Sequence, residues 1–154
     1  MTRVRYTDQR RQSRTAALQS LFAVDLRGHW TNSQLEWLDE DEVLPESAVE
    51  FAEELLGGVC RSQIGLDGVI TRYAPAWPVD QLSVIDRNIL RMALFELIYT
   101  PGTPRKTVIN EAVELAKNFG SESSARFVNG VLGSVMSGLE SGDIATIEPV
   151  SEWR

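Results

Sequence analysis

The chain of 154 residues is long enough for one domain or two small subdomains, and a hydrophobic content of 43% allows a packed core. The only cysteine, Cys60, excludes an intramolecular disulfide, and with a single histidine, His29, a zinc site is not expected. The net charge is −7, yet residues 1–14 hold five arginines and one acid (+4) while the other 140 residues hold 10 basic and 21 acidic side chains (−11).

Helical periodicity runs through the first half of the chain. The apolar pattern predicts a helix over residues 7–26, and then a short helix and a solvated acidic loop within 31–45. A long helix is predicted over 46–73, where Gly57 and Gly58 allow a break because glycine weakens a helix by up to ~1 kcal/mol. Residues 74–82, which contain two prolines, are the candidate linker.

The second half predicts three more helices. The helix over 83–99 is apolar on most sides and should be buried. The next should have Thr103 as its N-cap and Pro104 at its first position, where the missing N–H costs nothing, and should end near Phe119. The last is predicted over 123–137.

These elements predict an all-α fold of about six to seven helices, because no alternating strand pattern or hairpin turn is present. We expect a helical domain over 1–139, with subdomains of about 1–78 and 79–139, and a loose tail over 140–154. No apolar run approaches the ~18 residues of a membrane span, and no apolar segment of a secretory signal follows the N-terminus, so a cytoplasmic protein is expected.

The arginine-rich N-terminus is the first candidate site. Arg10, Arg11 and Arg14 fall on one face of the first helical turns, and Arg3 and Arg5 precede them. Guanidinium groups fit phosphate oxygens, and such contacts supply salt-dependent affinity with little sequence discrimination. The pattern favours an RNA-binding arm on an acidic body; the alternative is a solvated terminus that improves solubility.

Two other side chains invite a functional interpretation. Phe22 follows Arg14 by two helical turns and could stack on an unpaired base, although a core phenylalanine beside Leu18 is the commoner arrangement. Glu96 interrupts a very apolar helix, and without a nucleophile, a histidine or a second carboxylate nearby, a structural role is favoured. No P-loop, dinucleotide fingerprint or nucleophile elbow is present, so we expect no catalytic residue, no cofactor and no metal.

Several motifs resemble the NusB family. The most specific are VINEAVELAK at Val108–Lys117 and RFVNGVL at Arg126–Leu132. The preceding helix, around Ile89–Leu97, and the arginine-rich segment Arg10–Phe22 are also similar to the family's helices. Relatives often have a charged residue where Ser123 stands and a histidine where Ala125 stands.

The resemblance implies two packed helical subdomains and no enzymatic activity. It implies binding to single-stranded boxA-type RNA of ribosomal RNA leader transcripts, together with the ribosomal protein NusE, and action on the RNA polymerase elongation complex through other Nus factors. Asp86 falls where the family presents an acid to NusE. The RNA surface carried over by position comprises Arg10, Arg11, Arg14, Phe22, Arg91, Ser123, Arg126 and Phe127. Arg3 and Arg5 are added to it from the charge pattern of the N-terminus.

Two alternatives remain open. One is a NusB-like targeting domain related to that of ribosomal RNA cytosine methyltransferases, against which the 15 residues after position 139 argue, because they are too few for a cofactor-binding domain. The other is a helical dimer without an RNA role. The sequence leaves the oligomeric state open, and a homodimer is compatible with RNA binding as well as with a purely structural role.

Overall fold

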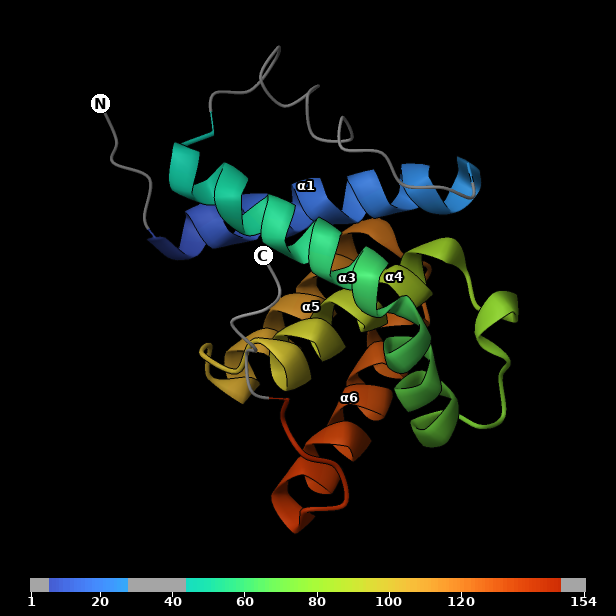
Figure 1. Cartoon of the computed structure of the whole chain (residues 1–154). Coiled ribbons are helices and arrows are strands. Elements are labelled where there is room, and N and C mark those ends of the chain that lie inside the picture. Colours follow the sequence, from blue (N-terminus) through green and yellow to red (C-terminus); the bar gives the residue numbers. More distant parts are fainter. Residues whose placement is uncertain (1–5, 28–43, 148–154) are drawn as a thin grey trace. The chain divides into compact units, whose positions relative to one another are not determined.

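The computed structural model describes residues 6–27 and 44–147, and over these residues every regular element is helical (Figure 1). The all-α prediction is confirmed. In chain order the elements are α1 (Tyr6–Arg27), α3 (Glu46–Tyr73), the 3-10 turn η1 (Val79–Gln81), α4 (Val84–Leu94), the π-helical turn η2 (Phe95–Tyr99), α5 (Arg105–Phe119) and α6 (Ser124–Ser141). The described part thus holds five α-helices, slightly fewer than expected, and most of the short helix expected within 31–45 lies outside it.

The chain divides into two compact units, Met1–Arg61 and Ser62–Arg154. The division falls inside α3. The expected subdomain boundary near residue 78 remains a prediction.

The helix predicted over 46–73 forms as α3, and the break that the sequence allowed at Gly57 and Gly58 does not occur, because α3 runs through both glycines without interruption. Leu55, Leu56 and Val59 around them are at most 3% exposed. Burying these side chains is worth about 1.5–3 kcal/mol each, which outweighs the cost of about 1 kcal/mol for each glycine.

The buried helix predicted over 83–99 forms, but its last turn is wider than an α-helix. Ser83 caps α4 by accepting a hydrogen bond from the Asp86 amide at 3.1 Å. In η2 the Thr100 amide donates to the Phe95 carbonyl five residues back, at 3.1 Å. The Ile98 carbonyl in this turn accepts a hydrogen bond from the Ile147 amide at 2.7 Å.

The start of α5 differs from the expectation at one residue. Pro104, rather than Thr103, is the N-cap, and its carbonyl accepts from the Val108 amide at 3.1 Å. A proline suits this place because the amide that it lacks would have no partner in the helix. No side chain caps this end of α5.

Helices α4, α5 and α6 pack against one another in the second unit (Figure 1). Their facing side chains, including Leu90, Ala116 and Leu132, are fully buried. Helix α6 continues to Ser141 and ends at Gly142, which has a left-handed φ of 80° as helix-ending glycines often do. Beyond this helix end, the Ile144 amide donates a hydrogen bond to the Gly138 carbonyl of α6. Part of the expected loose tail over 140–154 is therefore ordered.

Tyr73 at the end of α3 joins the C-terminal turn of α6. Its hydroxyl donates to Asp143 at 3.0 Å, and Arg72 pairs with the same carboxylate at 2.6 Å. Burial, and then the hydrogen bond to Asp143, raise the pKa of the Tyr73 phenol above its ordinary value.

Among the described helices, none combines the length and the hydropathy that a membrane crossing demands.

Candidate nucleic-acid interface

The three arginines of α1 that the sequence placed on one face have very different surroundings. Arg11 is exposed, Arg10 is half-buried and Arg14 is only 4% exposed. The guanidinium carbon of Arg10 lies 3.7 Å from the centroid of the Phe51 ring, and that of Arg14 lies 5.3 Å from it. Both distances fall within the range of cation–π interactions. The expected arm residues Arg3 and Arg5 lie outside the described residues.

A hydrogen bond holds the start of α3 against α1 beside these arginines. The Ser13 hydroxyl, which is fully buried, donates to the Ala48 carbonyl at 2.7 Å and also lies 2.9 Å from the Gln9 carbonyl. Since Ala48 and Phe51 are three residues apart on one helix, this contact fixes the part of α3 from which the ring projects.

Phe22 lies further along α1, at the edge of the apolar stripe. Its neighbours Leu18 and Leu21 are at most 3% exposed, whereas Phe22 is 37% exposed. The fully buried phenylalanine that we considered more common is therefore not what forms. A ring with more than a third of its surface accessible retains a face on which a base could stack.

A second group of candidate residues lies at the start of α6. Ser123 and Arg126 are exposed, and Phe127 is half-buried. No side chain caps this helix end, and its first turn has no acidic residue, so the positive end of the helix dipole and the Arg126 charge act together.

The turn before α6 is tightly packed. The Ser124 hydroxyl accepts from the Ser121 amide at 2.9 Å, and Ser124 is 1% exposed. A Cβ on Gly120 would come within 2.5 Å of the Ser124 side chain and 2.7 Å of the Ala116 carbonyl. Only glycine therefore fits at this position, and the close approach fixes the start of α6 relative to the end of α5.

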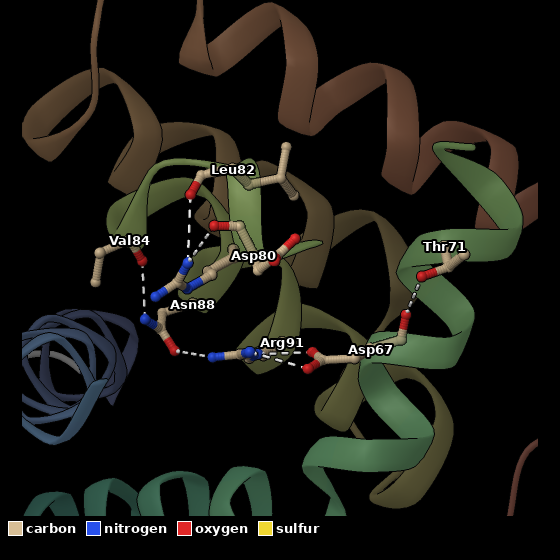
Figure 2. A network of polar contacts seen from close by, with 8 residues as sticks. Asp67, Thr71, Asp80, Leu82, Val84, Asn88 and Arg91 are labelled. Atoms are coloured by element: carbon tan, nitrogen blue, oxygen red, sulfur yellow. Dashed lines mark hydrogen bonds and ion pairs between the residues drawn. The ribbon is translucent and has the colours of Figure 1, made fainter. Parts of the chain in front are cut away.

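Arg91, which the resemblance placed on the RNA surface, is instead held inside a polar network (Figure 2). Its Nε donates to Asp67 Oδ1 at 2.7 Å and its Nη2 to Asp67 Oδ2 at 2.9 Å, a two-pronged ion pair between α4 and α3. Its Nη1 donates to Asn88 at 3.1 Å, and Asn88 donates in turn to the Val84 carbonyl at 2.8 Å. Arg91 is 6% exposed, which argues against direct contact with a phosphate.

Asp86, the expected contact for a protein partner, is half-buried. One of its carboxylate oxygens, Oδ1, is inaccessible to solvent and has no hydrogen-bond partner among the described residues. The guanidinium of the neighbouring Arg87 lies 3.4 Å from the carbonyls of Asp80 and Leu82.

Three residues of these sites carried no signal in the sequence. Phe51 belongs to an apolar stripe, Asp67 is one of many acids, and Ser13 is a small polar residue in a helix. Asp67 pairs with a residue 24 positions away in the chain, and Ser13 donates to one 35 positions away. Phe51 packs against Arg10, which lies on another helix. Local patterns therefore could not single them out.

The described residues contain no group of three or more histidine, cysteine, aspartate and glutamate side chains that could hold a metal ion. What they present is a helical scaffold with exposed guanidinium groups, accessible aromatic rings and helix starts, those of α5 and α6, that no side chain caps. This arrangement defines an all-helical protein with a candidate phosphate-binding surface.

Comparison with known proteins supplies the family. The sequence model of the NusB family matches residues 11–137. The transcription antitermination protein NusB of Dehalococcoides mccartyi (strain CBDB1) is 49% identical over 133 residues, which cover 86% of this chain and 93% of that protein. The chain therefore belongs to the NusB family, and the resemblance inferred from its motifs is confirmed.

Solved structures agree with this assignment. T. maritima NusB matches with a TM-score of 0.76 at 34% identity, over 88% of this chain and 97% of that chain. A crystal structure of the antitermination factors NusB and NusE in complex with dsRNA matches with a TM-score of 0.77 at 27% identity, over 84% of this chain and 97% of that chain.

Proposed function

We propose that this protein is a transcription antitermination factor. It binds boxA-type RNA of ribosomal RNA leader transcripts together with the ribosomal protein NusE, and it acts on elongating RNA polymerase through other Nus factors. Family membership, the relative named as an antitermination protein, and the similar structure with NusE and RNA support this function. The role requires binding and no catalysis, and action on nascent transcripts takes place in the cytoplasm.

The exposed guanidinium of Arg11, beside the half-buried Arg10, is the observation on which the RNA proposal depends most. These cations stand out because the chain beyond residue 14 carries a net charge of −11. Arg126 and Ser123 at the uncapped start of α6 provide a second set of phosphate-binding groups. Arg3 and Arg5 remain proposed members of the arginine-rich arm to which Arg10 and Arg11 belong.

Base recognition is assigned to two aromatic residues that keep accessible surface, Phe22 and Phe127. Phosphate contacts position the RNA and carry little sequence information, so discrimination must come from contacts with the bases. Arg14 and Arg91, which are 4% and 6% exposed, are each assigned a supporting role within their own unit rather than a contact with the RNA.

NusE is proposed to bind at the start of α4. Asp86 supports this, because it is half-buried rather than fully buried and so keeps surface that a partner can contact. The NusB homologue solved with NusE supports the choice of partner.

A matched pair of exposed cations tests the RNA proposal. Arg11→Ala should weaken binding of a boxA-type RNA oligonucleotide and lower the slope of log affinity against log salt by about 0.7 for a single strand or about 0.9 for a duplex. Lys106→Ala removes the same charge from an exposed position at the start of α5 and should leave both quantities nearly unchanged. Titrations with single-stranded and duplex RNA, with and without NusE, complete the experiment. If the two variants have the same RNA affinity and the same salt slope, the assignment of RNA binding to these arginines is wrong.

A further inference from the structure

We propose that Phe51 is a positioning residue for RNA binding, which holds the guanidinium of Arg10 ready to meet a phosphate. The inference rests on the proposed RNA-binding function and adds a residue to it. The ring lies at the first turns of α3, and its centroid is 3.7 Å from the Arg10 guanidinium carbon. At that distance the guanidinium is in van der Waals contact with the ring.

Phe51 itself is not placed to stack on a base. It is only 8% exposed, whereas Phe22 on α1 is 37% exposed. The groups through which Phe51 can influence RNA are therefore the two guanidinium groups over its ring, those of Arg10 and Arg14.

The ring also helps two like charges to stay close together. Arg10 and Arg14 stand four residues apart on α1, a spacing at which like charges repel. The negative face of the aromatic ring attracts both guanidinium groups and offsets part of this repulsion. Because Arg14 is 4% exposed and Arg10 is half-buried, Arg10 is the one of this pair that a phosphate can reach, next to the exposed Arg11.

The backbone around the ring is restrained as well. The buried hydrogen bond from Ser13 to the Ala48 carbonyl, at 2.7 Å, joins α1 to α3 between Arg10 and Phe51. An arginine side chain loses much rotational freedom when it is immobilised on binding. If Phe51 already orders Arg10 in the free protein, that loss is smaller, and removing the ring should lower RNA affinity by about 2- to 10-fold.

The experiment is a double-mutant cycle in the full-length chain, read out by fluorescence anisotropy with a synthetic boxA-type RNA oligonucleotide. The variants are Phe51→Leu, Arg10→Ala and their combination, and Phe51→Met is a second ring-free variant should Phe51→Leu fail to fold. Leu55→Ala, one turn further along α3 and fully buried, is the control for loss of core packing. Titrations are made at a temperature at which every variant is folded by circular dichroism.

We expect Phe51→Leu to weaken binding by about 2- to 10-fold in the wild-type background and by less than 2-fold in the Arg10→Ala background. Leu55→Ala should lower the unfolding midpoint and leave affinity unchanged. If Arg10→Ala weakens binding and Phe51→Leu does not, or if the two losses multiply, the positioning role is overturned while the proposed function stands. If neither Arg10→Ala nor Arg11→Ala affects binding, the arginine surface fails and the role of Phe51 fails with it.

Discussion

The role of Arg91 can be decided by removing its partner rather than Arg91 itself. In the structure both oxygens of Asp67 accept hydrogen bonds from the guanidinium, at 2.7 and 2.9 Å (Figure 2). The Asp67→Ala variant would leave this cation buried with Asn88 as the remaining partner shown in the network. If Arg91 has a structural role, the main effect should be on the free energy of unfolding.

The expected magnitude follows from the exposure of the two side chains. Breaking a fully buried ion pair costs about 3–5 kcal/mol. The Arg91 side chain is 7% exposed, but that of Asp67 is 26% exposed, so water can replace part of the lost carboxylate. We therefore expect Asp67→Ala to lower the free energy of unfolding by about 2–3 kcal/mol, near the value for hydrogen bonds to charged groups.

Urea unfolding and RNA titration together provide the assay. Asp67→Ala and Arg91→Ala should both shift the urea midpoint, and the folded protein should bind RNA with nearly wild-type affinity in each case. Arg126→Ala, at an exposed position on α6, is the opposite control, with weaker RNA binding at unchanged stability. A large affinity loss and a lower salt slope in Arg91→Ala, with Asp67→Ala binding normally, would refute the structural role and return Arg91 to the RNA surface.

Three further predictions concern base recognition, the partner site and the packing of α6. Phe22→Leu and Phe127→Leu should each weaken binding to a boxA-type RNA more than to a scrambled RNA, since stacking on one ring is worth about 1–3 kcal/mol; equal losses would show that the rings do not discriminate. Asp86→Lys should reduce NusE affinity in a calorimetric titration, whereas a lower melting temperature with normal NusE binding would indicate a role in helix stability alone. Gly138→Ala should destabilise the fold by about 1–3 kcal/mol because its Cβ would collide with the Tyr73 hydroxyl. A Cβ on Gly133 of the same helix would point into open space, so Gly133→Ala should stabilise the fold by about 0.5–1 kcal/mol; thermal melts that rank the two variants in the other order would contradict this packing.

Local patterns in the sequence were sufficient for the helical class, the approximate span of each described helix and the family. Apolar residues at helical spacing predicted α1 and α3 within one residue of their observed ends, and α5 ends at Phe119 as expected. These features depend on residues within a few positions of one another. Helical periodicity, and the glycines and prolines that end helices, act over the same short range. The family strings are likewise continuous stretches of one or two helices.

Only the tertiary structure decided which of the predicted site residues are accessible. Arg10, Arg11 and Arg14 look alike in the sequence, but Phe51 from another helix packs against two of them and leaves Arg11 exposed. Arg91 looked like an RNA contact until Asp67, 24 residues earlier, proved to bind its guanidinium. The physical reason is the same in both cases: helix formation depends on near neighbours, whereas the exposure and pairing of a charge depend on side chains that folding brings from distant parts of the chain.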